Sequence, residues 1–534
     1  MTKTSEKQEV KEQGYDEVPY HGLAFDYNRP ENLRTIGCLF GMTPPPLETA
    51  RILELGCSDG ANLLRFAETY PKSFTLGVDL SSVEIEQGKK RVAELKLKNL
   101  ELKTMSLTDL DESYGKFDYI ICHGVFSWVP DFVQEGTFDV TKKLLTKNGL
   151  TFISYNALPG WNEHRTVRDL MTYHASNFKN TQDRINQSRA CVDFLNEAIK
   201  DQNTPYAGFM QEATDHIKKE EDHYIRHEYL ADENKAFYLK DFVASAQTKG
   251  LQYVGDTDLN RMYTGNLPQK AMEALQNAGD VVRTEQYIDF LANTKFRCTV
   301  LCHDDVELSR SISEKTIENF YFYSHLRPTK PQDQINLEDN STLTFIVNNK
   351  ETSTIGANDP ESKALMMAIA KNNNNPLLID EIVAETQKLM PKANTETIKT
   401  HIHTHFPKMI FSKYLKILSD KPKSVYTISN KPKVSKLIRS QSKTLNEKGK
   451  ILITNAANQM LSFDSYHREI FSALDGKHTI AQLNDIALKE IQAGRITTQE
   501  NNKTVTDAKR LKELAAELVL RALEILRLTL CLIG

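Results

Sequence analysis

Arg51-Ile-Leu-Glu-Leu-Gly-Cys-Ser-Asp-Gly60 is the stretch around which the rest of this 534-residue chain is arranged. Arg51–Leu55 predicts a short buried strand, and residues 62–70 predict a helix. The turn between them has glycine at both ends, where the backbone can approach a ligand closely. A second apolar run, residues 74–78, ends in Asp79. This order of strand, glycine turn, helix, strand and acid is typical of α/β sheets that bind an adenosine-type cofactor, with the carboxylate on the ribose hydroxyls.

The glycine turn has to be compared with two cofactor patterns. A dinucleotide fingerprint requires G-x-G-x-x-G, and Ser58 occupies its middle glycine position. Glu54 precedes Gly56, and the stretch from Glu54 to Gly60 resembles motif I of the class I methyltransferases, E/D-x-G-x-G-x-G. Those enzymes bind S-adenosylmethionine (AdoMet). The resemblance favours AdoMet over NAD, although Ser58 replaces a glycine of this pattern too.

Strands and helices continue to alternate after Asp79. We expect a helix over residues 82–95, a third strand over 100–104, a fourth over 117–123 and a fifth over 150–154. Asn148-Gly149 is expected to be the helix stop that precedes the fifth strand. This alternation predicts an α/β fold with a doubly wound, Rossmann-like parallel sheet.

The composition is typical of a soluble globular protein with two to four domains, with 40% hydrophobic and 26% charged residues. A net charge of −4 argues against a general nucleic-acid binder. Seven scattered cysteines favour a reducing cytoplasm over disulfides. No signal peptide is visible, and charges interrupt the apolar tail at residues 518–533. We therefore expect a cytoplasmic protein with neither a membrane segment nor a nucleic-acid partner.

Further motifs resemble one family. His123-Gly124 to Trp128-Val-Pro130 follows the fourth strand, and Ser154-Tyr-Asn to Pro159-Gly-Trp161 follows the fifth. With the glycine turn and Tyr15-Asp-x-x-Pro-Tyr20, they resemble bacterial methyltransferases that carry a methyltransferase regulatory domain. Asp289-Phe-Leu to Phe296-Arg-Cys resembles the same family. The likeness is strongest to rickettsial protein-lysine methyltransferases that modify outer membrane protein B, and it covers about residues 15–303.

This resemblance implies AdoMet as the cofactor and a set of contacts for it. Asp79 is expected to bind the ribose, and the loop near Ser106 and Asp109 is expected to lie against the adenine. The aromatic segment that contains Tyr20 either folds over the cofactor as a lid or packs on the outside of the sheet. The residues expected to contact the cofactor are Tyr20, Glu54, Gly56, Cys57, Gly60, Asp79, Leu80, Ser106, Leu107 and His123.

Four aromatic residues, Phe126, Trp128, Tyr155 and Trp161, follow the fourth and fifth strands. A lysine acceptor must lose a proton, which costs about 4–5 kcal/mol at pH 7. A desolvated aromatic channel beside the sulfonium lowers that cost and holds the cation by cation–π attraction. We expect the four aromatics to line this channel, without a dedicated general base. The alternative is that Phe126 and Trp161 belong to the core.

The chain beyond the cofactor domain predicts several further units. We expect an N-terminal lead and lid segment over residues 1–46, the AdoMet-binding domain over 47–160, and a helical regulatory, substrate or dimerisation domain over 161–303. A middle domain is expected over 304–370, and a winged-helix-like and helical domain over 371–534. Residues 463–483 resemble a winged-helix unit, with a small helical packing module as the alternative. The helix over residues 508–530 buries its apolar face in the chain or in a second subunit.

Two groups of histidines were compared with metal sites. His216, His223 and His227 lack a third ligand of clear spacing, and the alternation of His401, His403 and His405 predicts a surface strand. Solvated surface is the favoured interpretation of both, so no metal is expected.

The function expected from the resemblance is that of an AdoMet-dependent protein-lysine N-methyltransferase. Its partner would be a lysine-rich outer-membrane protein, methylated in extended or unfolded segments, and the enzyme would be a homodimer. Two alternatives remain: a small-molecule methyltransferase and a catalytically idle AdoMet-binding regulator. The length of chain outside residues 47–160 is excessive for a small substrate.

Overall fold

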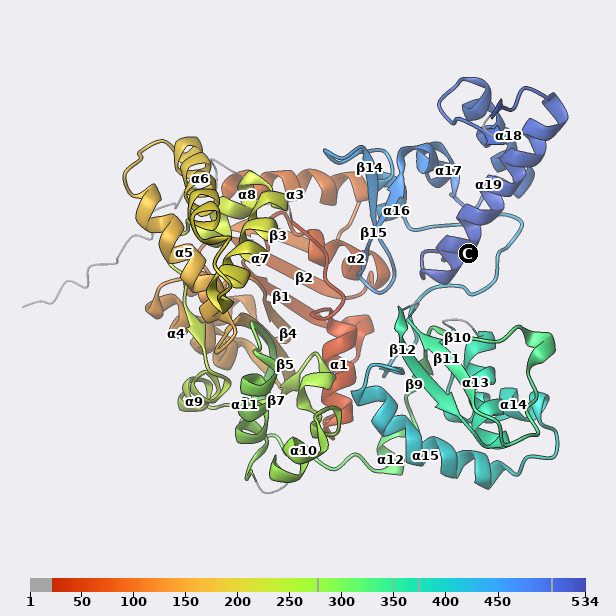
Figure 1. Ribbon diagram of the computed structural model, residues 1–534, viewed down its shortest axis with the longest axis horizontal. Helices are drawn as coiled ribbons and strands as arrows, with labels where there is room; N and C mark the ends of the chain where they lie inside the picture. The colour runs from red at the N-terminus through yellow and green to blue at the C-terminus, as the bar shows by residue number, and fades with distance from the viewer. Residues whose placement is uncertain (1–21, 276–277, 349, 373–374, 501–502) are drawn as a thin grey trace, which may run out of the picture.

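The computed structural model describes residues 22–275, 278–348, 350–372, 375–500 and 503–534. Its centre is a mixed sheet in the order β3-β2-β1-β4-β5-β8-β7, with β6 paired to β5 (Figure 1). The strands are β1 Arg51–Leu55, β2 Phe74–Asp79, β3 Leu100–Thr104, β4 Phe117–Cys122, β5 Leu145–Ala157, β6 Ala236–Phe237, β7 Leu251–Asp256 and β8 Phe296–His303. The first five are parallel, which confirms the predicted doubly wound fold.

Helices cover both faces of this sheet. Because side chains alternate along a strand, Ile52 packs on one face with α1, α2 and α3, while Leu53 and Leu55 pack on the other with α4 and α9. These helices are α1 Pro30–Leu39, α2 Ala61–Thr69, α3 Ser82–Leu95, α4 Asp131–Leu144 and α9 Leu239–Thr248. Because β1 and β4 pair in parallel, their carboxyl ends lie side by side at the centre of the sheet, where the strand order reverses.

Two expectations for the sheet were wrong. β5 begins at Leu145, directly after α4, so Asn148-Gly149 lies inside the strand rather than at a helix stop. A Cβ on Gly149 would lie 2.8 Å from the backbone oxygen of Asp118, so glycine allows close packing against β4. Residues 161–303 are not a separate helical domain, because β7 and β8 extend the central sheet in antiparallel fashion.

Residues 161–229 form a purely helical part of that region, seen at the upper left of Figure 1. It consists of α5 Trp161–Ala175, α6 Thr181–Ile199, α7 Pro205–Lys219, α8 Asp222–Tyr224 and the π-helical turn η5 Ile225–Tyr229. Its own core is made by residues at helical spacing, such as Val167, Met171 and Val192. The helices α10 Gln269–Leu275 and α11 Val281–Ala292 follow β7.

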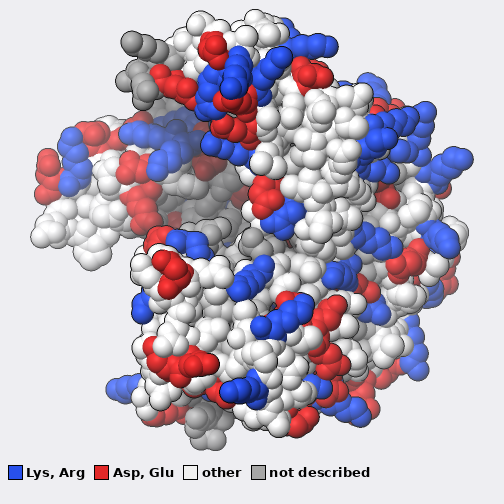
Figure 2. All heavy atoms as spheres, turned by 90° about the vertical axis from the view of Figure 1, so that its right-hand side faces the viewer, with Lys and Arg blue, Asp and Glu red and all other residues white. Residues whose placement is uncertain are grey.

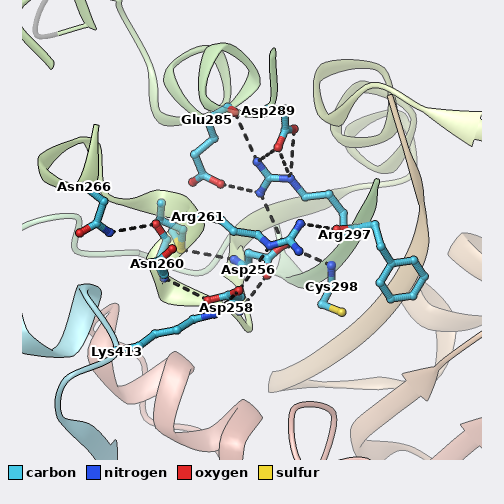
Figure 3. A network of polar contacts seen from close by, with 12 residues as sticks. Asp256, Asp258, Asn260, Arg261, Asn266, Glu285, Asp289, Arg297, Cys298 and Lys413 are labelled. Carbon is cyan, nitrogen blue, oxygen red and sulfur yellow. Dashed lines mark hydrogen bonds and ion pairs between the residues drawn. The ribbon is translucent and has the colours of Figure 1, made fainter. Parts of the chain in front are cut away.

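A buried arginine joins α11 to the sheet, as Figure 3 shows. Arg297 on β8 is 0% exposed and pairs with Asp289 at 2.8 Å, Glu285 at 2.8 Å and Asp256 at 3.5 Å. Burial raises the pKa of Glu285 to about 7 and also raises that of Asp256. The positive charge of Arg297, which the three carboxyls share, lowers both pKa values and offsets only part of this effect. This network shows that Asp289 and Arg297, which lie in one sequence motif, are direct partners.

The lower right of Figure 1 is a unit with one core, formed by residues 317–417. Its elements are α12 Glu314–Ile317, β9 Tyr321–Tyr323, β10 Leu326–Pro328, β11 Leu343–Val347, β12 Lys350–Ala357, α13 Pro360–Asn372, α14 Ile379–Leu389, α15 Thr395–Phe411 and β13 Lys416–Leu418. The boundary expected at residue 370 falls inside this core. Lys413 reaches Asp258 at 2.7 Å and ties the unit to the central sheet (Figure 3).

The strand predicted around His401, His403 and His405 was wrong, because all three lie in α15. Ile398, Ile402 and Phe406 are buried at helical spacing on that element. His401 and His405 therefore share a face, with ring centroids 5.9 Å apart. Their neighbours Asp359 and Glu361 have ligand atoms within 4.8 Å of those of His401, but Asp359 already caps α13 by accepting the Ser362 N–H.

The C-terminal unit comprises α16 Lys436–Gln441, β14 Lys450–Thr454, β15 Met460–Asp464, α17 Arg468–Ala473, α18 Ile480–Gln492, β16 Gln499–Glu500, β17 Lys503–Thr504 and α19 Ala508–Leu528. Val519, Leu523 and Leu526 of α19 are buried in its core, whereas Leu520 and Ile525 are exposed. The main apolar face of α19 is thus covered within the chain. Among the residues that the structure describes, no helix is both long and apolar enough to span a bilayer.

Candidate cofactor and methyl-transfer site

The glycine turn after β1 has the conformation that its sequence predicts. Gly56 has φ +72°, and a Cβ there would lie only 2.3 Å from Cγ2 of Val125. Gly60 has φ +74° and forms the N-cap of α2. Ser58, which replaces a glycine of the motif, adopts φ +49°, so this position keeps the left-handed backbone without glycine.

Asp79 is fixed at the end of β2 by the backbone around it. Its Oδ2 accepts the Ser58 N–H at 2.8 Å, and its Oδ1 accepts the Ser81 N–H at 2.9 Å. A carboxylate has about four lone-pair sites, which is the acceptor chemistry that ribose hydroxyls require. Leu80 comes next and is 48% exposed, which offers an apolar surface beside that position. The turn, the acid and the apolar surface fit AdoMet.

Glu54 lies beneath the turn rather than at its surface. It is 4% exposed, and its Oε1 accepts a hydrogen bond from Nδ2 of Asn62 at 2.8 Å. Burial raises the pKa of Glu54 to about 8, and the carboxylates of Asp79 and Asp59 reinforce that shift. Glu54 is therefore a neutral acid at pH 7, and its hydrogen bond to Asn62 holds the first turn of α2 from the buried side.

Asp59 was missed by the sequence reasoning. It is 2% exposed, accepts the Ala61 N–H at 3.0 Å and pairs with Arg91 of α3 at 2.5 Å. A Cβ on Gly22 would lie 2.0 Å from Oδ1 of Asp59, so the N-terminal segment passes directly against the turn. The N-terminal segment, expected either to cover the cofactor or to pack on the sheet, thus lies against the glycine turn. Tyr20 itself lies outside the described residues.

His123 occupies the carboxyl end of β4, beside the glycine turn. Oγ of Ser154 accepts the Gly124 N–H at 3.0 Å and lies 2.8 Å from Nδ1 of His123. Burial lowers the pKa of His123 to about 4, so its ring is neutral. Nε2 of His123 lies 3.1 Å from the hydroxyl of Tyr27, so the neutral ring donates a hydrogen bond through one nitrogen and accepts one through the other.

The other expected cofactor residues are placed as follows. Cys57 is 5% exposed, lies against Gly77 of β2, and burial raises its pKa, so its thiol packs inside the sheet. Leu107 is 8% exposed in the core under η2 Leu107–Asp109. Ser106 caps that turn by accepting the Thr108 N–H. Only Ser106 of these three side chains is partly accessible.

Phe126 and Tyr155 lie in the hydrophobic core, contrary to the expectation that they line a channel. They are 2% and 1% exposed, and Tyr155 stacks on Phe242 with centroids 4.0 Å apart. The hydroxyl of Tyr155 pairs with Thr299 at 3.0 Å. Their side chains point to the face covered by α4 and α9, where Phe126 packs against Phe138 and Phe242 with ring centroids 5.2 Å away.

Trp128 and Trp161 are half-buried and lie together. Their rings meet edge to face with centroids 6.3 Å apart, and Nε1 of Trp161 donates to Asn234 at 2.9 Å. Trp161 stacks on His164 at 4.2 Å, and His164 packs against Tyr229 of the π-helical turn at 4.2 Å. Burial lowers the pKa of His164 to about 4, so this aromatic cluster carries no positive charge at pH 7. His164 had no recognisable signal in the sequence.

Comparison with known proteins decides the family. Residues 47–229 match a methyltransferase domain, residues 221–303 a predicted methyltransferase regulatory domain, and residues 430–529 the PKMT C-terminal winged helix domain. The structure of PKMT2 from Rickettsia typhi is 40% identical, with a TM-score of 0.90, and covers 96% of this chain and 100% of that chain. The chain belongs to the PKMT family. The winged-helix interpretation of residues 463–483 is thereby confirmed.

Two further relatives support the same conclusion. PKMT2 from Rickettsia typhi in complex with AdoHcy is 41% identical, with a TM-score of 0.89 over 97% of this chain. An uncharacterised protein of Rickettsia prowazekii (strain Madrid E) is 36% identical over 500 residues, 93% of this chain and 90% of that protein. This member of the PKMT family is an AdoMet-dependent methyltransferase, and AdoMet supplies the methyl group as a sulfonium.

Proposed function

We propose that this enzyme methylates lysine side chains of an outer-membrane protein, in segments that are extended or unfolded. The observation that carries the proposal is its similarity over the full length of PKMT2, a protein-lysine methyltransferase. The Trp128–Trp161 cluster supports it, because this uncharged aromatic surface follows β4 and β5 at the sheet edge where the cofactor turn lies.

The residues around the aromatic cluster suit an amine acceptor. A lysine must arrive as the neutral amine, and an apolar, uncharged surface disfavours the ammonium form. His164 is neutral there, and the indole faces of Trp128 and Trp161 can hold a cationic methylated product. These side chains orient the amine and exclude water, whereas the glycine turn and Asp79 hold the cofactor.

An extended acceptor is proposed because a lysine can enter a narrow aromatic opening only if its flanking backbone lies across the rim. A folded surface seldom presents lysine in this way. Figure 2, which faces the right-hand side of Figure 1, shows a hollow in the surface with side chains of both charge signs around it. Such a surface suits contacts to backbone and to general charge, so several lysines of one substrate would be accepted.

We also propose that the enzyme works as a homodimer in the cytoplasm, where an exported substrate is still unfolded. Tyr173 of α5 and Phe194 of α6 are 80% and 73% exposed, which leaves apolar surface on the helical part for a second copy. Light scattering after size exclusion should give twice the mass of the 60.8 kDa chain. A Tyr173→Ser, Phe194→Ser double variant should give the mass of one chain.

The test of the substrate class uses one outer-membrane protein in three forms: native, denatured, and as short lysine peptides. Radiolabelled AdoMet supplies the methyl group, and mass spectrometry maps the modified positions. We expect many methylated lysines in the denatured protein and fewer in the native one. Methylation of a single lysine in the native fold alone would refute the mechanism, and label only in small molecules would favour the alternative activity.

A further inference from the structure

The turn of the β14–β15 hairpin reaches from the C-terminal unit to α2 (Figure 1). Asn455 builds this turn, because its Oδ1 accepts the N–H groups of Ala457 at 2.8 Å and Gln459 at 2.9 Å. Its Nδ2 donates to the backbone oxygen of Thr529 at 2.8 Å and fixes the turn to the end of α19. Asn458 stands at the tip with φ +57° and is only 5% exposed.

The side chain of Asn458 binds the cofactor domain rather than its own unit. Its Nδ2 lies 2.8 Å from Oδ1 of Asn62, 3.2 Å from the backbone oxygen of Asn62 and 3.2 Å from the backbone oxygen of Phe25. One amide nitrogen thus contacts α2 and the N-terminal segment together. Water is largely excluded from this contact, which strengthens such hydrogen bonds and makes their loss costly.

Asn62 connects Asn458 to Glu54, the residue below the glycine turn. It lies in the first turn of α2, two residues after Gly60, and its Nδ2 donates to Glu54 below the turn at 2.8 Å. Its Oδ1 also accepts the Phe25 N–H at 3.1 Å. A continuous chain of hydrogen bonds therefore runs from Asn458 through Asn62 to Glu54.

The same hairpin also holds the N-terminal segment against the site. Nε2 of Gln459 donates to Asp26 at 2.8 Å, next to Phe25. The ring of Phe25 packs on His123 with centroids 4.2 Å apart, at the carboxyl end of β4. The start of α2, which follows the glycine turn, and the N-terminal segment over β4 are thus both in contact with the winged-helix unit.

We propose that Asn458 is a positioning residue for AdoMet and that the winged-helix unit is a structural part of the cofactor site. Its hairpin turn holds α2, and with it the glycine turn, in register with the N-terminal segment. The expected consequence is mutual: the hairpin favours the binding-competent arrangement, and bound AdoMet in turn stabilises the docked hairpin. A winged helix that served only substrate or partner binding would leave AdoMet affinity unchanged.

The Asn458→Gly variant tests this role without straining the backbone. Glycine adopts positive φ readily, so the turn is retained while the amide is lost. We expect AdoMet to bind about five- to thirtyfold more weakly in calorimetric titration, as for the loss of one or two buried hydrogen bonds. Asn458→Asp keeps the size but places oxygen opposite Oδ1 of Asn62, so it should weaken AdoMet binding as well.

Asn348 offers a matched control. Like Asn458 it has a positive φ, +53°, and it lies between β11 and β12. Its Nδ2 donates to the backbone oxygen of Lys413, which belongs to the same unit of residues 317–417 and not to the cofactor domain. Asn348→Gly should leave AdoMet affinity unchanged. Wild-type affinity in both Asn458 variants, or an equal loss in the control, would overturn the proposal.

Hydrogen exchange of the wild-type enzyme gives a second readout that needs no variant. AdoMet should slow exchange of the backbone amides of residues 455–459, which lie outside the cofactor domain. An exchange rate that AdoMet leaves unchanged there, while it slows exchange in the glycine turn, would show that the hairpin and the cofactor are not coupled.

Discussion

Replacement of Glu54 by glutamine should change how the stability of the cofactor domain depends on pH. The folded carboxyl has a pKa of about 8, raised by burial from the ordinary value of 4.5. Well below pH 4.5 both the folded and the unfolded chain carry this proton, so the group does not make the free energy of unfolding depend on pH. Between pH 4.5 and 8 only the unfolded chain releases it, and stability falls as pH rises.

The size of this effect follows from the shift. Each unit of pKa is worth about 1.4 kcal/mol, so Glu54 should remove up to about 5 kcal/mol of stability by pH 8. Glutamine cannot ionise and still offers an oxygen to Nδ2 of Asn62. The stability difference, Glu54→Gln minus wild type, should therefore grow from pH 5 to pH 8 and then level off. The unpaired amide hydrogens of the variant add a cost that does not depend on pH.

Urea unfolding followed by tryptophan fluorescence measures this difference. Both tryptophans of the chain, Trp128 and Trp161, lie beside the cofactor domain, so their emission reports its unfolding. Glu135→Gln, at an exposed position of α4, is the control and should give the wild-type profile. Parallel pH profiles of Glu54→Gln and wild type would refute the conclusion that Glu54 is protonated in the folded enzyme.

Three further substitutions test other parts of the structure. Asp79→Ala should weaken AdoMet binding by about 1.5–3 kcal/mol through loss of charge-assisted hydrogen bonds to the ribose, and unchanged affinity in calorimetry would exclude that contact. Trp161→Ala should lower turnover on a protein substrate with nearly unchanged AdoMet affinity, whereas wild-type turnover in the folded variant would contradict a role in the acceptor channel. Arg297→Met should lower the free energy of unfolding by about 3–5 kcal/mol, because three buried carboxyls lose their cation. A loss well below this range in urea unfolding would contradict a stabilising role of the buried Arg297 network.

The cofactor half of the fold was predictable because its signals are local. A strand, the glycine turn and Asp79 lie within thirty residues of one another, and parallel strands that alternate with helices leave few possible topologies. The antiparallel strands β7 and β8 were not predicted, since their apolar runs stand among helices and β8 pairs with β5, which is far away in sequence. The alternation of His401 and His405 predicted a strand where the structure has a helix, because the helical spacing of Ile398, Ile402 and Phe406 was overlooked.

The site was predictable at the level of strand ends, but not at the level of side-chain direction. Phe126 and Trp128 are two residues apart after β4, yet the first is in the core and the second is half-buried beside Trp161. Asp59 and Asn62 follow Gly56 closely, but their importance comes from Arg91 and Asn458, which sequence spacing cannot reveal.

The contact between Asn458 and Asn62 joins residues 396 positions apart in the chain. During synthesis at about 5–20 residues per second, the first turn of α2 waits roughly 20–80 s before its partner leaves the ribosome. The central strands can pair during that time, but Asn62 and Phe25 meet their last partner only when the β14–β15 hairpin has folded. Nascent chains should therefore acquire full affinity for AdoMet late, so that cofactor binding marks a finished polypeptide.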